Sequence, residues 1–185
     1  MRSQSDNQIM LNVRDGDLDK LSILFERYHK TLFNFFFRLT NNRMISEDLV
    51  QEVFLRMLNY RHTYRGDGKF SNWMFHISRN VHVDYFKKHS REQQLTNDEQ
   101  DVVSRDSNCD NTLVQAQEVE LLRTALARLP IEKREALVLS RFQNMKYEDI
   151  AALQCCQVGT IKARIHRAIK ELRNIYSKLS GENLS

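Results

Sequence analysis

The chain has 185 residues, 41% of them hydrophobic and 28% charged, which fits one ordinary soluble domain or two small ones. Its formal net charge of +4 favours a polyanionic partner, although it is too small to identify one. The odd set of Cys109, Cys155 and Cys156 excludes a disulfide framework and contains no Cys-x-x-Cys pair for zinc. Because no apolar run reaches the ~18 residues of a membrane span and no signal-peptide pattern is present, we expect a cytoplasmic protein without direct membrane insertion.

The N-terminal half predicts a series of helices. Only five glycines and one proline occur in the whole chain, which favours an all-α fold. Helices are expected over residues 7–14, 18–39 and 46–60, with a break at Asn41 and Asn42. Ser46 is predicted to cap the third helix, whose first turn is acidic, and Ser71 is predicted to cap the fourth.

An acidic segment separates the two halves of the chain. Residues 91–111 contain six acidic and only two basic side chains, with few apolar ones between them. Such a composition cannot bury enough surface to fold alone. We therefore expect a flexible linker between two small helical domains, which cover residues 1–90 and 112–185.

The C-terminal half predicts a helix-turn-helix. Residues 112–129 have helical spacing, and Pro130 suits the first turn of the next helix, over residues 131–142. Then come a short helix over residues 147–153, the break QCCQ, and a long helix over residues 158–179. A short helix, a tight connection and a longer basic helix are typical of this DNA-binding motif.

The long last helix has one apolar and one basic face. The apolar face contains Val158, Ile161, Ile165, Ala168, Ile169, Leu172, Ile175 and Tyr176. The basic face predicts a recognition helix, in which residues near the N-terminus approach base edges and later ones contact phosphates. The base-reading candidates are Thr160, Lys162, Ala163, His166 and Arg167, and the phosphate candidates are Arg164, Lys170 and Arg173.

The helix over residues 46–60 predicts a protein-binding patch. Its buried face is expected to contain Val50, Val53, Phe54 and Met57, and its outward face Asp48, Gln51, Glu52 and Leu55. A leucine among acidic and polar neighbours on an outward face suggests an apolar contact within a polar rim.

The stretch HISRNVHVDYFKKHSR, residues 76–91, combines basic and aromatic residues with one asparagine. This combination, together with the preceding loop, is typical of a surface that binds unstacked single-stranded DNA. The candidates are Tyr64, Arg65, Trp73, Arg79, Asn80, Asp84, Lys87 and Lys88. Trp73 also fits a packing role, and Asp84 also fits an intrahelical ion pair with Arg79 or Lys88.

These motifs closely resemble the extracytoplasmic-function group of bacterial RNA polymerase sigma factors, in the sigma-70 family. The resemblance covers nearly the whole chain and rests on FERYHKTLFNFFFRLTNN, SEDLVQEVFLRML, FSNWMFHISRNVHVDYFKK, ALARLPIEKREALVLSRFQNMKYEDIAAL and VGTIKARIHRAIKELR. Its most specific parts are Asp-x-x-Gln-Glu-x-Phe, Leu-Pro-x-x-x-Arg, Tyr-x-x-Ile-Ala and Val-Gly-Thr-x-Lys-x-Arg. It implies a region 2 in the N-terminal half and a region 4 in the C-terminal half.

The resemblance also implies a role for each predicted surface. The patch of Asp48, Gln51, Glu52 and Leu55 would dock on the β′ clamp helices of core RNA polymerase, and apolar surface of the C-terminal domain would engage the β flap. The stretch at residues 76–91 and its loop would bind and open the promoter −10 element, and the last helix would read the −35 element. Many members of the group are held by an anti-sigma factor, which the resemblance therefore adds as a partner.

The turn of the helix-turn-helix departs from the family pattern. The family often has glycine at the position of Cys155 and serine or proline at that of Gln157. We therefore expect Cys155 to adopt a conformation that glycine adopts more easily, and Gln157 to be a poor N-cap.

Two other function classes fit the sequence less well. A stand-alone helix-turn-helix regulator would need a dimerisation surface, and no heptad or spare apolar face suggests one. An enzyme is not expected, because the sequence has no glycine-rich phosphate loop, no nucleophile beside a base and no metal-ligand set. We accordingly expect no cofactor and no metal.

Overall fold

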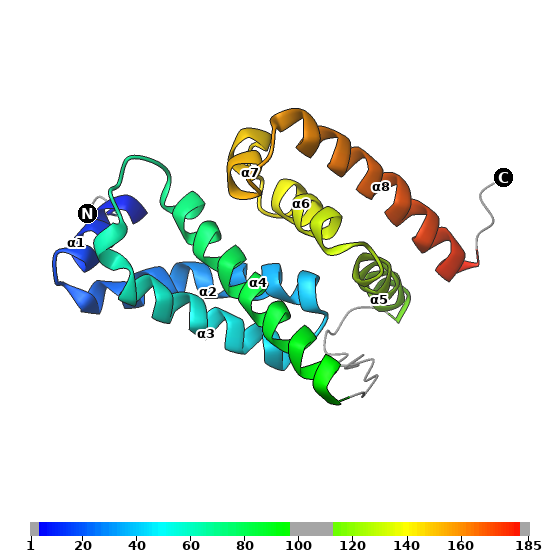
Figure 1. Cartoon of the computed structure of the whole chain (residues 1–185), viewed down its shortest axis with the longest axis horizontal. Coiled ribbons are helices and arrows are strands. Elements are labelled where there is room, and N and C mark those ends of the chain that lie inside the picture. Colours follow the sequence, from blue (N-terminus) through cyan, green and yellow to red (C-terminus); the bar gives the residue numbers. More distant parts are fainter. Residues whose placement is uncertain (1–3, 97–112, 182–185) are drawn as a thin grey trace. The chain divides into compact units, whose positions relative to one another are not determined.

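The computed structural model of the protein describes residues 4–96 and 113–181, with side chains for residues 4–89 and 117–181. Every regular element in these ranges is helical, which confirms the predicted all-α fold (Figure 1). The elements are α1 (Asp6–Arg14), the 3-10 helix η1 (Leu18–Lys20), α2 (Leu21–Thr40), α3 (Arg43–Asn59), the 3-10 helix η2 (Arg61–Thr63), α4 (Phe70–Thr96), α5 (Leu113–Ala127), α6 (Ile131–Arg141), α7 (Tyr147–Leu153) and α8 (Val158–Ser180).

The described chain folds into two compact units. The first comprises residues 4–34 and 44–96, and the second comprises residues 35–43 and 113–181. Helix α4 continues to Thr96 and so extends into the segment predicted as linker, of which residues 97–111 lie outside the described ones. Within the described ranges, no helix combines the length and apolar character that crossing a bilayer requires.

Helix α1 lies within one residue of its predicted bounds, whereas the helix predicted over residues 18–39 begins as the 3-10 helix η1 and becomes α-helical at Leu21. The Ser5 hydroxyl accepts a hydrogen bond from the Gln8 backbone N–H at 3.2 Å, which satisfies one of the free donors at the start of α1. Helix α2 ends at Thr40 because Asn41 adopts a positive φ of 51°, a conformation that asparagine tolerates better than most residues. The predicted break at this position is confirmed.

Both serine caps predicted in the N-terminal half are wrong. Helix α3 begins at Arg43, which places Ser46 inside the helix and fully buried. Helix α4 begins at Phe70, before Ser71. The Phe70 backbone N–H donates to the Asn7 side-chain oxygen at 2.8 Å, so the cap comes from α1. Capping by a residue so distant in the chain has no local sequence signal.

The core of the first unit matches the predicted apolar faces. Val50, Val53, Phe54 and Met57 of α3 are all buried, as expected. Helix α4 contributes the buried side chains of Phe70, Met74, Phe75, Ile77 and Val81. With one face of each helix fixed in this way, the opposite faces of α3 and α4 remain exposed to solvent.

In the second unit, α6 is held to its neighbours by polar contacts as well as by its buried apolar side chains. The Arg134 guanidinium donates to the carbonyls of Ala127 and Leu129, at 2.9 Å for the latter, and so ties α6 to the end of α5. Burial lowers the pKa of Arg134 to about 10, so the side chain stays charged at neutral pH. This contact explains why arginine stands four residues after Pro130 in the Leu-Pro-x-x-x-Arg motif.

Candidate functional site

Helices α7 and α8 form the predicted helix-turn-helix. Helix α7 ends at Leu153 with Gln154 as its C-cap, and Cys155 then adopts a left-handed φ of 51° with its side chain exposed. Gln157 precedes α8, and its side chain makes no capping hydrogen bond to any described residue. Both expectations for this turn are confirmed, since a non-glycine residue occupies the left-handed position and the N-cap is weak.

We expect Cys155→Gly to stabilise the second unit. The left-handed conformation strains a residue with a Cβ, so glycine should raise the free energy of unfolding by roughly 0.5–1 kcal/mol, after allowance for its greater freedom in the unfolded chain. Denaturant unfolding followed by circular dichroism measures the change. Cys156→Gly is the control, because Cys156 is not among the residues with positive φ and glycine there should stabilise nothing.

A polar network fixes α8 against α6 and α7. The Gln154 amide donates to buried Glu135 of α6 at 2.7 Å, and its oxygen accepts a hydrogen bond from Arg164 of α8 at 2.5 Å. Arg164 also pairs with Glu132 of α6 at 3.1 Å, which leaves its side chain 19% exposed. The sequence predicted Arg164 as a phosphate contact, which stays a prediction, and in the structure the side chain contacts Gln154 and Glu132.

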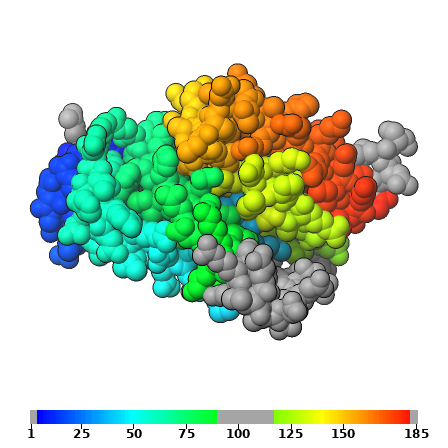
Figure 2. All heavy atoms as spheres, viewed as in Figure 1, coloured from blue at the N-terminus to red at the C-terminus, as the bar shows by residue number. Residues whose placement is uncertain are grey.

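The two faces of α8 separate as predicted. Ile161, Ile165 and Ala168 are buried, and Val158, Ile169, Leu172, Ile175 and Tyr176 are partly buried. The opposite face is exposed at Thr160, Lys162, Ala163, His166, Arg167, Lys170 and Arg173. Helix α8 is the orange to red part of the surface in Figure 2. Helix α8 therefore packs one face into the domain core and exposes cationic and small side chains on the other.

The outward face of α3 carries the predicted patch and one residue that sequence reasoning missed. Asp48, Gln51 and Leu55 are exposed, with Leu55 at 53%. Met44 lies four residues before Asp48 on the same stripe and is 70% exposed. Met44 was missed because the helix was predicted to begin at residue 46, whereas α3 begins at Arg43.

Glu52 is joined to α4 through an arginine. Its carboxylate accepts a hydrogen bond from Arg56 Nε at 2.6 Å, and Arg56 Nη1 contacts Asp84 Oδ2 at 2.7 Å. The predicted ion pair of Asp84 with Arg79 or Lys88 is thus replaced by one between helices. Burial of the guanidinium lowers the pKa of Arg56, but its hydrogen bonds to Asp84 and Glu52 together outweigh burial and leave that pKa raised.

The candidates on α4 and its preceding loop divide into exposed and packed groups. Asn80, Asp84, Lys87, Lys88 and Arg65 are exposed, and Trp73 and Arg79 are partly buried. Tyr64 is only 4% exposed, and its ring packs edge-on against Trp73 with 5.0 Å between centroids. In the absence of DNA the Tyr64 ring thus packs inside the protein, and its contact with DNA stays a prediction.

Comparisons with known proteins agree with this geometry. The family model for sigma-70 region 2 matches residues 24–92, and that for sigma-70 region 4 matches residues 119–172. The chain is 30% identical to the RNA polymerase sigma factor CarQ of Myxococcus xanthus over 173 residues, covering 94% of this chain and 98% of CarQ. It is 29% identical to the ECF RNA polymerase sigma factor SigX of Bacillus subtilis, covering 89% and 87% of the two chains.

A solved structure supports the same assignment. The sigma factor RpoE of Bartonella quintana, solved in complex with the anti-sigma factor NepR, matches with a TM-score of 0.74 and 26% identity. The match covers 83% of this chain and 94% of RpoE. Two region matches in the expected order and a relative aligned along almost its whole length lead to one conclusion: the chain belongs to the sigma-70 family of RNA polymerase sigma factors, in the extracytoplasmic-function group.

Proposed function

We propose that this sigma factor directs core RNA polymerase to promoters by using a separate surface for each partner. The exposed cationic face of α8 reads the −35 element, with Lys162, His166 and Arg167 nearest to base edges. The observation that carries this assignment is the separation of that face from the buried Ile161 and Ile165 on the second helix of a helix-turn-helix. A cationic helix face whose opposite side is packed into the domain core can enter the major groove of DNA.

The exposed side of α4 and its loop binds the −10 element as it opens. Asn80 offers both a donor and an acceptor to a base edge, and Lys87 and Lys88 lie about two turns further along the same helix. Arg65 extends the cationic surface into the loop. These groups suit a single DNA strand whose bases have left the duplex. The cations would neutralise its phosphates, and Asn80 would contact an unpaired base.

Two surfaces meet the polymerase. The first is the α3 patch of Asp48, Gln51, Glu52 and Leu55, extended by the exposed Met44, which docks on the β′ clamp helices. The second is a groove of about 490 Å³ between α5 and α8, which receives the β flap. Its lining is mainly apolar, with Val119 at 48% and Leu122 at 37% exposure. The groove is lined by Glu118, Val119, Leu122, Ile169, Leu172, Arg173 and Tyr176.

An anti-sigma factor competes for the polymerase-binding surfaces. Exposed apolar side chains on both units, such as Leu55 and Val119, favour a protein that covers them when polymerase is absent. The similarity to a sigma factor solved with an anti-sigma factor supports this assignment. The chain itself performs no catalysis, and the chemistry of RNA synthesis belongs to the core enzyme.

In vitro transcription with purified core polymerase on a genomic library tests the proposed function. We expect start sites that share −10 and −35 sequences and appear only when core and this protein are both present. A stand-alone regulator would instead shift duplex promoter DNA in an electrophoretic assay without core. Tight binding of that kind, together with no association with core, would overturn the proposal.

Asn80→Ala should weaken promoter opening more than closed-complex formation. The loss of one amide that contacts an unpaired base should lower the rate of opening roughly 5- to 10-fold, the equivalent of about one hydrogen bond. Permanganate footprinting measures opening, and filter binding at low temperature measures the closed complex. Asn59→Ala, at an exposed asparagine at the end of α3, is the control. An equal loss at both steps contradicts the role of Asn80.

A further inference from the structure

One face of α1 contacts the segment that leads into α4. Asn7, Leu11 and Arg14 are spaced four and three residues apart, so they lie on one side of the helix. Each of them touches residues between η2 and the first turn of α4. We name Asn7, Leu11 and Arg14 the α1 face, and residues 64–70 the entry loop.

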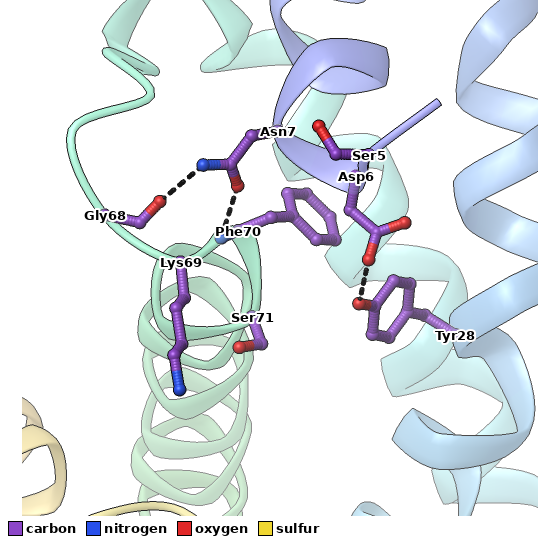
Figure 3. Close-up of a pocket in the computed structure, with 8 residues that line it drawn as sticks. All are labelled: Ser5, Asp6, Asn7, Tyr28, Gly68, Lys69, Phe70 and Ser71. Atoms are coloured by element: carbon purple, nitrogen blue, oxygen red, sulfur yellow. Dashed lines mark hydrogen bonds between the residues drawn. The ribbon is translucent and has the colours of Figure 1, made fainter. Parts of the chain in front are cut away.

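Asn7 binds the entry loop at both of its ends. Its Nδ2 donates to the Gly68 carbonyl at 2.7 Å, and its Oδ1 accepts from the Phe70 N–H at 2.8 Å (Figure 3). The same oxygen accepts from the Tyr64 hydroxyl at 2.9 Å. One amide thus holds the first and the last residue of the loop and also caps α4.

The other two residues hold the middle and the start of the entry loop. Gly66 has a φ of 81° and lies so close to α1 that a Cβ there would meet the Leu11 side chain at 3.3 Å. Arg14 Nη1 donates to the Tyr64 carbonyl at 3.3 Å. The Leu11 side chain limits how the loop can move at Gly66, and hydrogen bonds fix both ends of the loop. The entry loop is therefore held against α1.

The entry loop connects this face to the candidate −10 surface. Tyr64 packs against Trp73, and its neighbour Arg65 is exposed. Two anchored residues, Tyr64 and Gly66, therefore flank Arg65 and restrict the positions its backbone can take. A loop held in one conformation before binding loses less entropy when it meets a ligand.

We propose that the α1 face is a positioning element for −10 recognition. It holds the entry loop in the conformation that meets unpaired promoter bases, so that Asn7 acts on promoter choice without touching DNA. This inference rests on the proposed −10 role of α4 and its loop. A merely structural role would predict a loss of stability with unchanged discrimination among −10 sequences.

The replacement Asn7→Asp separates positioning from stability. Aspartate keeps an acceptor for the Phe70 N–H and suits a helix N-terminus as well as asparagine does. It loses the donor to the Gly68 carbonyl and places a carboxylate oxygen opposite it. We therefore expect α4 to stay capped and the thermal midpoint to stay near that of the wild type, while the entry loop loses its attachment at the Gly68 carbonyl, which the carboxylate would repel.

The experiment uses holoenzyme assembled from core polymerase and the full chain. Transcription is measured on a cognate promoter and on a series that each carry one substituted non-template −10 base. We expect Asn7→Asp to lower the ratio of cognate to substituted transcription roughly 3- to 10-fold, the effect of losing about one hydrogen bond. Gln8→Ala is the matched control, because the Gln8 side chain bonds Asn12 on the exposed side of α1 and its loss should leave the ratio unchanged.

The possible outcomes are distinguishable. A wild-type holoenzyme that ignores every −10 substitution overturns the proposed function and this inference with it. A discriminating wild type with an equally discriminating Asn7→Asp overturns the inference alone. The thermal midpoint and the discrimination ratio of Asn7→Asp are measured on the same preparation, so a loss of folding is not mistaken for a loss of discrimination.

Discussion

Leu55→Asp is expected to reduce the affinity of this sigma factor for core RNA polymerase on the order of 100-fold or more. Burial of a leucine side chain at an interface is worth about 1.5–3 kcal/mol, and every 1.4 kcal/mol is a factor of ten in affinity. The new carboxylate would also lie in an interface without a partner, three residues after the acidic Glu52 on the same helix, which adds desolvation and repulsion costs. Leu55 is 53% exposed, so the free protein should keep its fold.

Competition for core against a fluorescent wild-type protein measures this loss directly. Leu18→Asp is the matched control, because Leu18 is 44% exposed on the same unit but lies outside the α3 patch. It should compete as well as the wild type. An equal loss of affinity in both variants would mean that exposed leucines of this unit act through folding, and the assignment of Leu55 would fail.

The helices and their buried faces were predictable from sequence because they depend on local signals. Helix α7 occupies the predicted residues, and the buried side of α3 is the one that the 3–4 spacing indicated. The left-handed Cys155 was also predictable, since the family pattern has glycine there. In each case the information lies within a few residues of the feature itself.

What sequence reasoning missed depends on partners distant in the chain. The cap of α4 comes from Asn7, and Asp84 pairs with Arg56 of another helix. Arg164 was predicted to contact DNA because it is a positively charged residue on a basic helix. In the structure it also forms an ion pair with Glu132 and a hydrogen bond with Gln154. Charge and spacing along one helix cannot tell an arginine that binds its own domain from one that binds a ligand.

Because Arg164 contacts Glu132 and Gln154, Arg167 is the stronger candidate for the arginine that we propose reads the −35 element. Arg167 is exposed, and its Nε makes only a 3.3 Å contact to the Ala163 carbonyl of its own helix. Its guanidinium is therefore available to a guanine edge or a phosphate in the major groove. The contacts of Arg164 with Glu132 and Gln154 would hold α8 at a fixed angle to α6 and α7.

Arg167→Ala should lower −35-dependent transcription roughly 30-fold, near the middle of the 1–3 kcal/mol range for a bidentate arginine–base contact. Transcription from a template with a pre-melted −10 region and no −35 element should survive, because α8 has no part in it. Lys178→Ala is the control, since Lys178 is an exposed lysine at the far end of the same helix. Equal losses on both templates would place Arg167 in polymerase binding or folding, because a residue that reads −35 sequence cannot affect a promoter that lacks it.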